Sequence, residues 1–491
     1  MKVSQNWLKE LVDINSTPEV LAEKLSIGGF EVESLKDTSL QVKGVLLGNV
    51  LSVEKHPNST KLSVCQVDIG NKNILQIVCG ARNIKSDIHV YVATVGSYLS
   101  SIGLSIKKSE IRGVSSEGMI CSLEELGLDS NSDGIEIIDP LTIKDHKLGT
   151  EASKILGLND HIFDLAITAN RPDGMSVIGI AREISALLQT KLTLPPEHEI
   201  INLNAFKTDK LCQETINSEC IYTISYIDNV NGKQTSPKWI KERLEKSDIK
   251  SKNLIVDITN YILLEQGQPL HAFDLEKLSQ LIGREVLPED FGVRKAKNGE
   301  FLTALDGIKY ELNENISIVV CSDKPVAIAG VIGGLETAVT EQTSSIILEG
   351  AVFNPSIIRK SSREVGIRTE SSSRFEKGIS FRNTLNSLSR AFYLLNQYFK
   401  ESKPTIYSSK IINKEKKYIK LRRERIYKIL GPIVNNSNDE LGKIQVIKRN
   451  LNDREITDKL KLIGCELHNQ SYGWDVEVIS NRSSDLIREI D

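Results

Sequence analysis

Long apolar runs are missing from this sequence of 491 residues, and so is any signal for export. No stretch approaches the roughly 20 apolar residues that a membrane-spanning helix needs. The first residues, MKVSQNWLKELVD, include the acids Glu10 and Asp13 and lack the apolar core of a signal peptide. We therefore expect a cytoplasmic protein with no membrane partner.

Paired cysteines and an excess of charge are missing as well. The seven cysteines form no CxxC pair and have no histidine at zinc-binding spacing, so we interpret them as reduced thiols. Lysine and arginine number 62 against 65 aspartate and glutamate residues, for a net charge of -3. This balance argues against indiscriminate nucleic-acid binding, and we expect no DNA partner, but it leaves room for a local RNA site.

The chain is long enough for several domains, and its patterning changes along its length. Helical spacing at Trp7–Leu11 and Thr17–Leu25 gives way to short β-branched runs between about Leu40 and Pro140. Helical spacing then returns near Ala152 and at Gly179–Leu188. We predict a discontinuous helical and mixed domain, residues 1–38 plus 151–199, interrupted by a small β-barrel at 39–150.

The rest of the chain predicts an α+β domain at 205–400 and a partial helical domain at 405–491. Strands are predicted at ILLEQ, FGVRKA, ISIVVCS, PVAIAGVIGG and SSIILEGAVF, and helices at PKWIKERLEKS and from Arg382 to Phe399. Further helices are predicted around Arg422–Leu430 and Arg454–Ile463, while residues 431–450 stay unassigned. The fold class is therefore a multidomain α+β protein.

Three motifs in the barrel segment point to RNA. KHPN at 55–58, IVCGARN at 77–83 and RGVSSEGMICSLEELGL at 112–128 would each be ordinary turn chemistry alone. Together, in this order, they resemble the tRNA-binding oligonucleotide-fold module of several synthetases and free-standing tRNA-binding proteins. Residues 40–150 contain Tyr91 and Tyr98 as their only aromatics, so we expect phosphate contact rather than base stacking, with Lys55 and Lys61 as candidates.

A second group of motifs narrows the family. LAITANRPDGMSVIGIAREISAL at 165–187 predicts a helix-entry loop in which Asp173 or Ser176 caps the next helix, an architectural role. VDITNYILLEQGQPLHAFD at 256–274, PVAIAGVIGG at 325–334, SSIILEGAVFNP at 344–355 and SSSRFEKG at 371–378 follow it. These stretches resemble the β subunits of bacterial-type phenylalanyl-tRNA synthetases, and the resemblance covers essentially the whole chain.

The resemblance implies a hydrolytic editing pocket in the domain at 205–400. Carried over by position, the pocket residues are Thr259, Asn260, His271, Gly330 and Glu349. Without the resemblance, His271 would be read as a structural histidine bonded to a backbone carbonyl, and Glu349 as an acid at a strand end. No Ser-His-Asp or Cys-His grouping is visible in this segment, so we predict attack by water without a covalent enzyme intermediate.

The last segment, EVISNRSSDLIREID, resembles the part of the family that binds Mg²⁺ near the α subunit, in a helix-turn-helix-like domain. By position, the resemblance implies Asp485 and Asp491 as ligands, with Asp485 preceding a helix that Asp491 enters. The two other acidic ligands of the family would lie beyond residue 491, and Arg482-Ser483-Ser484 departs from the family's aromatic-arginine pair. We expect a weak metal site in a truncated chain.

The implied function is that of the β subunit of phenylalanine–tRNA ligase. In the family, an α2β2 tetramer joins phenylalanine to tRNA(Phe) with ATP, and synthesis takes place in the α subunit. This chain lacks the phosphate-binding loop GxxxxGKS or GxxxxGKT, and we expect no aminoacylation by the chain alone. Two alternatives stay open, a non-enzymatic tRNA-binding module and a free-standing aminoacyl-tRNA deacylase.

Overall fold

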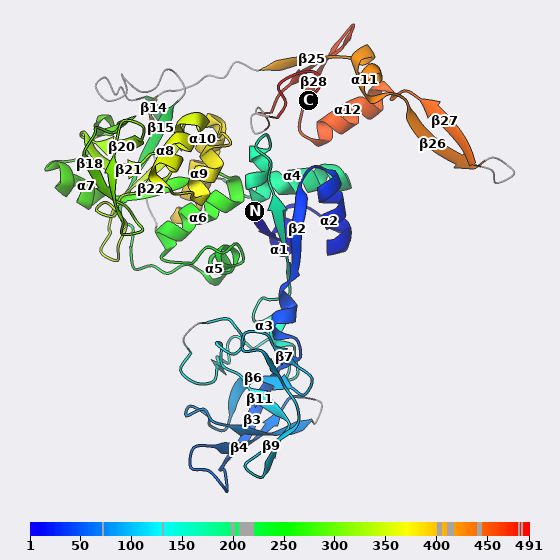
Figure 1. The fold of residues 1–491 in the computed structure, drawn as a ribbon, viewed down its shortest axis with the longest axis vertical. Coiled ribbons are helices and arrows are strands. Elements are labelled where there is room, and N and C mark those ends of the chain that lie inside the picture. Colours follow the sequence, from blue (N-terminus) through cyan, green and yellow to red (C-terminus); the bar gives the residue numbers. More distant parts are fainter. Residues whose placement is uncertain are drawn as a thin grey trace. The chain divides into compact units, whose positions relative to one another are not determined.

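The structure is a computed structural model that describes residues 1–70, 73–129, 132–197, 202–205, 220–399, 405–409, 417–438, 444–479, 482 and 485–491. Its internal contacts separate two compact units, residues 35–162 and residues 1–34 with 163–491. The chain passes between them within the strands β2 (Glu31–Asp37) and β13 (His161–Ala166) (Figure 1). The predicted domain limit at residue 199 lies outside the described residues. So do Ser483 and Ser484, where the sequence departs from the family's aromatic-arginine pair.

Helices and sheets occur in both units, and the predicted mixed α+β class is confirmed. Among the described helices, none is long and apolar enough to cross a bilayer. The larger unit holds several sheets together with most of the helices.

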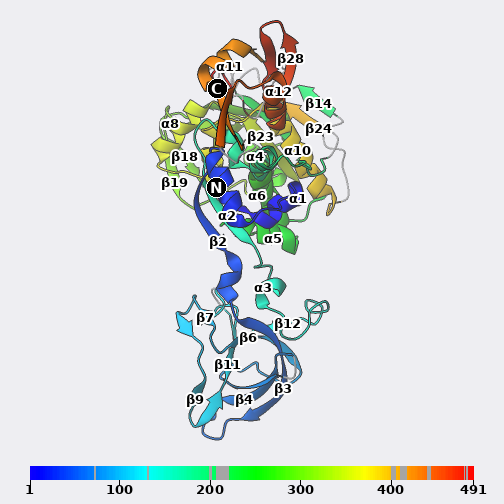
Figure 2. The ribbon, with the colours of Figure 1, turned by 90° about the vertical axis from the view of Figure 1, so that its right-hand side faces the viewer.

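The smaller unit is a barrel whose sheet has the strand order β11-β6-β3-β4-β5, with β12 paired to β6 (Figures 1 and 2). Its edges nearly meet, because the Glu117 N–H donates to the Gln76 carbonyl at 2.8 Å and Gln76 Nε2 donates to the Ser115 carbonyl at 2.9 Å. The small barrel predicted from the sequence is thus confirmed. The barrel strands are β3 (Val45–Lys55), β4 (Ser63–Asp68), β5 (Ile74–Cys79), β6 (Ile88–Thr94), β11 (Gly118–Ile120) and β12 (Ile137–Ile138).

Short hairpins and one helical turn complete this unit. The hairpin strands are β7 (Tyr98–Leu99) with β8 (Leu104–Ser105), and β9 (Ser109–Ile111) with β10 (Val114–Ser116). The helix predicted near Ala152 is a single turn, α3 (Ala152–Ile155).

The N-terminal helices of the larger unit begin at hydroxyl-bearing residues. Ser4, Thr17 and Ser176 each accept a backbone N–H at the start of a helix, which satisfies a donor that has no partner within the helix. Ser176 is therefore the cap among the two predicted candidates. These helices are α1 (Gln5–Leu11), α2 (Pro18–Ile27) and α4 (Val177–Leu188). In the sheet of this region, β13 lies between β1 (Lys2–Ser4) and β2.

Two sheets face each other in the region that contains the candidate pocket. The first has the strand order β14-β24-β15-β23-β16 and the second the order β17-β20-β21-β22. The strands of the first are β14 (Asn202–Ala205), β24 (Thr405–Ser408), β15 (Ile221–Ile227), β23 (Ile346–Val352) and β16 (Leu270–Asp274). Those of the second are β17 (Phe291–Lys295), β20 (Ser317–Cys321), β21 (Lys324–Ile328) and β22 (Ile332–Gly333), and β18 (Glu300–Thr303) and β19 (Lys309–Leu312) form a hairpin.

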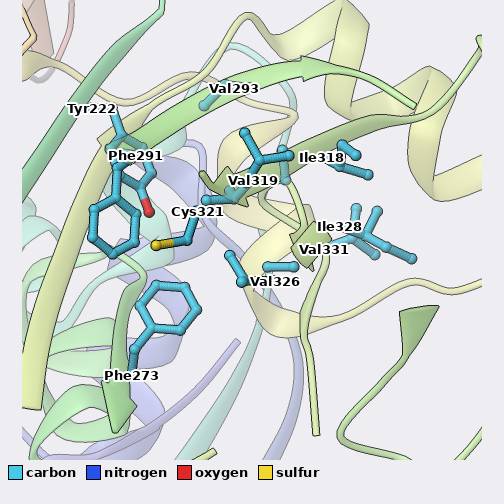
Figure 3. Packing of buried hydrophobic residues seen from close by; sticks show 14 of the residues in the cluster. Tyr222, Phe273, Phe291, Val293, Ile318, Val319, Cys321, Val326, Ile328 and Val331 are labelled. Carbon is cyan, nitrogen blue, oxygen red and sulfur yellow. The ribbon is translucent and has the colours of Figure 1, made fainter. Parts of the chain in front are cut away.

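A hydrophobic core fills the space between these sheets (Figure 3). Tyr222 and Phe273 enter it from the first sheet, and Phe291 enters it from the second. The Tyr222 ring stacks on Phe291 and the Phe273 ring is tilted against it, each with ring centroids 6.0 Å apart. The other face of the first sheet meets α10 (Phe381–Asn396), because a side chain at Gly350 would begin 2.9 Å from Thr384.

The prediction of a strand at ILLEQ is wrong, because these residues end the helix α6 (Leu254–Gln266). Asn253 caps the helix and Gly267 ends it in the left-handed conformation that glycine tolerates. The helix is buried on several sides, so its apolar residues run without the polar breaks of a surface helix. The predicted helix at PKWIKERLEKS is confirmed as α5 (Lys238–Glu245), and the one from Arg382 as α10.

The remaining helices of this region are α7 (Leu275–Ile282), α8 (Pro355–Val365) and α9 (Glu370–Phe375). The C-terminal segment has a sheet with the order β25-β29-β28 and both predicted helices, α11 (Arg423–Leu430) and α12 (Asp453–Leu462). A hairpin of β26 (Ile433–Asn438) and β27 (Ile444–Arg449) separates these helices, in the stretch for which no structure was predicted. The sheet strands are β25 (Tyr418–Arg422), β28 (Glu466–Gln470) and β29 (Gly473–Glu477).

Candidate functional site

His271 and Glu349 are direct neighbours on paired antiparallel strands. His271 of β16 lies opposite Glu349 of β23, and Ile224 of β15 lies opposite Glu349 on its other side. Opposite residues in an antiparallel pair point to the same face of the sheet, with Cβ atoms roughly 5 Å apart. The two polar side chains therefore share the face that meets the second sheet.

Glu349 is in the middle of its strand, not at the strand end expected from the sequence. It is the fourth of the seven residues of β23, and 8% of its surface is exposed. Gly350, the next residue, serves the close packing of α10 against the sheet. Burial raises the pKa of Glu349 to about 7, and the nearby phenol of Tyr222 counteracts part of this shift. About half of the carboxyl groups are then ionised at neutral pH.

Tyr222 adds a second buried polar group beside this carboxyl. Burial, and then the neighbouring Glu349, hold the pKa of its phenol well above the ordinary value. Its hydroxyl makes no hydrogen bond within the described residues. Figure 3 shows Tyr222 gathered with Phe291, Phe273 and Cys321 at one end of the core.

The ring of His271 is neutral at pH 7, because burial lowers its pKa to about 4. Its Nε2 is buried and has no hydrogen-bond partner in the described part of the chain. The ring packs edge-on against Phe273, with centroids 4.4 Å apart. Neither ring nitrogen of His271 is hydrogen-bonded to a backbone carbonyl among the described residues, so the alternative of a carbonyl-bonded structural histidine does not describe it.

Gly333 also belongs to this neighbourhood, although it is not among the residues predicted from the sequence. A Cβ atom at Gly333 would lie 2.5 Å from His271 Cε1 and 2.8 Å from Nε2, and 3.2 Å from Leu305 Cδ1. Its backbone therefore closes directly onto the imidazole. The paired glycines Gly333-Gly334 at the end of PVAIAGVIGG were the available signal for such a close approach.

Gly330 lies in the turn between β21 and β22, with a φ of +65°. A side chain there would meet Ile358, Phe375 and Phe353 at distances of 2.9 to 3.1 Å. The next residue, Val331, accepts a hydrogen bond from Thr369 Oγ1 at 2.8 Å. This turn thus joins the His271 neighbourhood to α8 and α9.

Thr259 and Asn260 are on α6. Thr259 Oγ1 donates to the Val256 carbonyl of its own helix at 2.7 Å. Asn260 is half-buried. Neither side chain is hydrogen-bonded to His271 or Glu349 among the described residues, so the direct pairing found here is limited to His271, Glu349 and Gly333.

In the barrel, Lys55 and Lys61 are exposed at the two ends of the β3–β4 loop. His56 Nδ1 accepts the Asn58 N–H at 3.0 Å, so its Nε2 carries the proton and donates to the Ile111 carbonyl at 3.0 Å. Asn58 Nδ2 donates to the Arg112 carbonyl at 2.9 Å. The KHPN and RGVSS motifs are therefore parts of one anchored loop pair.

The NRPD motif is organised around the buried Arg171. Arg171 forms ion pairs with Asp173 at 2.9 Å and Glu183 at 2.8 Å, and its guanidinium lies 4.3 Å from the centre of the Phe30 ring. The adjacent Asn170 donates to Asp485 at 2.9 Å. These contacts join the N-terminal and C-terminal segments of the larger unit.

Asp485 and Asp491 line one open pocket of about 530 Å³ together with Asn170, Ile487 and Arg488. Each carboxylate has an arginine partner, Arg482 for Asp485 and Arg488 for Asp491. Hydrogen bonds from Arg488 lower the pKa of Asp491. Two carboxylates with open space beside them fit a hydrated Mg²⁺, but the arginines compete for them. Asp485 lies in a turn, and residues 486–491 contain no helix.

Comparison with known proteins gives two family models. A model described as a putative tRNA binding domain matches residues 45–144, and a model described as a B3/4 domain matches residues 219–400. The first match covers the barrel, and the second contains His271, Gly333 and Glu349.

Curated relatives match the whole chain. The phenylalanine–tRNA ligase beta subunit of Prochlorococcus marinus (strain MIT 9312) is 66% identical over 491 residues, which are all of this chain and 60% of that protein. The same subunit of Synechococcus sp. (strain CC9605) is 45% identical over all of this chain and 59% of its own. An N-terminal fragment of the phenylalanyl-tRNA synthetase beta subunit from Pyrococcus horikoshii matches with 15% identity and a TM-score of 0.33, over 66% of this chain and 85% of that chain.

The chain spans about 60% of the length of these curated relatives. Its match to them extends across both family models and the segments between. The chain belongs to the family of phenylalanine–tRNA ligase beta subunits.

Proposed function

We propose that this chain provides tRNA binding and proofreading to a phenylalanine–tRNA ligase, and that it hydrolyses tyrosyl-tRNA at the site of His271 and Glu349. The observation that supports this most is that a residue with a neutral imidazole, His271, lies directly opposite, on the paired strand, a residue with a buried carboxyl whose pKa is about 7, Glu349. Attachment of phenylalanine to tRNA(Phe) with ATP belongs to an α subunit in an α2β2 tetramer. The assembly works in the cytoplasm, where translation takes place.

A second site is needed because a synthetic pocket for phenylalanine rejects tyrosine weakly. An apolar pocket discriminates against an added hydroxyl only on the order of a hundredfold. An editing site can select tyrosine instead, by binding the hydroxyl that phenylalanine lacks. Ionised Glu349 accepts a phenolic hydrogen bond, whereas phenylalanine would leave the buried carboxylate unpaired at a cost of about 1 to 3 kcal/mol. Phenylalanyl-tRNA is then released intact.

The ester is cleaved by water. The neutral His271 offers an acceptor nitrogen that holds a water proton, and the water oxygen adds to the ester carbonyl. The bond between the carbonyl carbon and the 3′-terminal ribose oxygen then breaks, and that oxygen takes the proton that the attacking water gives up. The products are tyrosine and a tRNA with a free terminal hydroxyl. Thr259, Asn260 and Gly330 contribute to the walls that receive the terminal ribose.

A cysteine nucleophile finds no support. Cys321 lies in the core near Tyr222, and burial raises the pKa of its thiol to about 12. The thiol is therefore protonated at neutral pH and is a poor nucleophile.

The barrel binds the tRNA backbone through Lys55 and Lys61, which the anchored β3–β4 loop presents to solvent. Asp485 and Asp491 would hold a hydrated Mg²⁺, whose charge would offset theirs between the N-terminal and C-terminal segments. Titration with Mg²⁺ should give a weak site that Asp485→Asn with Asp491→Asn removes. Persistence of the site in that variant would contradict the assignment.

The decisive experiment measures hydrolysis of tyrosyl-tRNA and phenylalanyl-tRNA by the 491-residue chain. Glu349→Ala should abolish the preference for tyrosyl-tRNA, and His271→Ala should slow hydrolysis at least tenfold. Glu311→Ala, which removes an exposed acid, is the matched control. An unchanged rate in Glu349→Ala would contradict the editing role of Glu349, and hydrolysis no faster than the spontaneous reaction would favour a non-enzymatic tRNA-binding module. Charging of tRNA by the chain alone with ATP and phenylalanine would contradict the division of labour between the subunits.

A further inference from the structure

A group of cations surrounds Lys377, just after α9. Burial lowers the pKa of Lys377 first, and the charges of Arg368, Arg359 and Arg374 lower it further. Glu376 is the one acid whose charge opposes them in this surrounding set. Such a concentration of positive charge on one surface favours the binding of an anion.

The fold neutralises only one of these cations. Arg374 is buried and forms an ion pair with Glu370 at 2.6 Å, and it also donates to the Glu370 and Met175 carbonyls. Arg359 is exposed and donates to the Glu376 carbonyl at 3.2 Å. Arg368 is exposed, and neither it nor Lys377 forms an ion pair among the described residues. Arg359, Arg368 and Lys377 together are called the α8–α9 cation cluster below.

Two contacts fasten this cluster to the turn beside the candidate pocket. Thr369, which follows Arg368, donates to the Val331 carbonyl at 2.8 Å. Phe375 is two residues before Lys377, and a Cβ atom added at Gly330 would lie 3.0 Å from its Cδ2 atom. The short strand that follows this turn, β22, contains Gly333, whose backbone closes onto the imidazole of His271. The cluster and the candidate pocket thus lie next to the same short segment, residues 330–333.

We propose that the α8–α9 cation cluster binds the phosphates of the unpaired 3′-terminal nucleotides of the misacylated tRNA. Phosphodiester oxygens are the anions that such a substrate must bring next to its terminal ester, and guanidinium and ammonium groups bind them with charge-assisted hydrogen bonds. Holding the last phosphates beside the turn aims the ester at His271. The inference rests on the proposed editing function, because it names the substrate contact of that site.

The test uses a double variant, Arg368→Ala plus Lys377→Ala. Its control is a second double variant, Lys459→Ala plus Lys461→Ala, which removes two exposed lysines of α12. The first readout is binding of a short single-stranded RNA with the sequence of the tRNA 3′ end, over a range of salt concentrations. The second is KM and kcat for hydrolysis of tyrosyl-tRNA.

The cluster variant should bind the short RNA about tenfold more weakly, and the slope of log affinity against log salt should fall by about 0.7 for each phosphate that the variant no longer binds. KM should rise about tenfold with little change in kcat, and the control should match the unmodified chain. Arg368→Lys with Lys377→Arg should restore most of the affinity, which separates removal of charge from misfolding.

An RNA affinity and a KM equal to those of the control would overturn the inference. The outcome is distinct from failure of the editing function itself. If the editing function fails, Glu349→Ala leaves hydrolysis unchanged whatever the cluster variant does. If only the inference about the cluster fails, Glu349→Ala still changes hydrolysis.

Discussion

His271 and Gly333 are so close that a single methyl group added to the glycine would begin 2.5 Å from Cε1 of the ring. Real Cβ contacts do not occur at that distance, so Gly333→Ala must move the imidazole away from its place opposite Glu349. We expect hydrolysis of tyrosyl-tRNA to fall at least tenfold. Kinetics of the variant, with circular dichroism to check folding, measure this effect.

Gly80→Ala is the control for this substitution. A side chain at Gly80 would begin 3.5 Å from Leu62 Cδ2, which is an ordinary contact distance, and the residue is in the barrel. This variant should hydrolyse tyrosyl-tRNA at the rate of the unmodified chain. A Gly333→Ala chain with full activity would show that the imidazole position does not matter for hydrolysis.

Local features of the fold could be predicted from the sequence because their causes are local. Thr17 and Ser176 cap helices with their own hydroxyls, so a short stretch of sequence contains the whole interaction. The apolar run at ILLEQ was predicted wrongly because its burial depends on helices far away in the chain.

The site was predictable only in part, for the same reason. His271 and Glu349 were selected through a family resemblance, since nothing in the local sequence indicates that β16 pairs with β23. Gly333 was missed because its requirement comes from a ring on another strand. The raised pKa of Glu349 follows from burial between two sheets, which no spacing of residues reveals.

Glu349→Gln should stabilise the chain at neutral and alkaline pH. Burial raises the pKa of Glu349 from 4.5 to about 7, so the folded state binds its proton more tightly than the unfolded state. The stability of the unmodified chain therefore falls as pH rises from about 4.5 to about 7 and is level above that. The full difference is on the order of 3 kcal/mol at most, because one pKa unit corresponds to about 1.4 kcal/mol.

The measurement is the difference in thermal midpoint between this variant and the unmodified chain at several pH values. The difference should favour Glu349→Gln above pH 7 and disappear near pH 4.5. His271 titrates in both proteins, so its own lowered pKa cancels in the comparison. A difference that stays constant across this range would show that Glu349 is not the group with the raised pKa.

Arg390→Ala should be strongly destabilising. Arg390 and Glu265 are both buried and joined by two hydrogen bonds, of 2.9 and 3.0 Å, and Tyr261 donates to the same carboxylate at 2.8 Å. Removing the guanidinium leaves a buried charge without its partner, at a cost of about 3 to 5 kcal/mol. Chemical denaturation followed by far-ultraviolet circular dichroism measures the decrease in stability.

The control for the buried pair is Arg454→Ala, on α12. Arg454 pairs with Asp458 at 3.6 Å, and both side chains are largely exposed, so the decrease in stability should stay below about 0.5 kcal/mol. Replacing both buried partners, with Arg390→Met and Glu265→Leu, should cost less than Arg390→Ala because no charge is then left unpaired. Equal decreases in the buried and exposed variants would contradict this account.

Lys55→Ala with Lys61→Ala should weaken tRNA binding without affecting the chemistry of hydrolysis. Both lysines are on the loop that His56 and Asn58 anchor to the neighbouring hairpin, so the loop presents its charges in a fixed position. If each lysine contacts one phosphate, the slope of log affinity against log salt should fall by about 0.7 to 0.9 per lysine. Filter binding of full-length tRNA at several salt concentrations measures the slope. Lys144→Ala with Lys147→Ala removes two other exposed lysines of the same unit and should leave the slope unchanged; equal slopes for the two double variants would mean that the anchored loop does not contact phosphate.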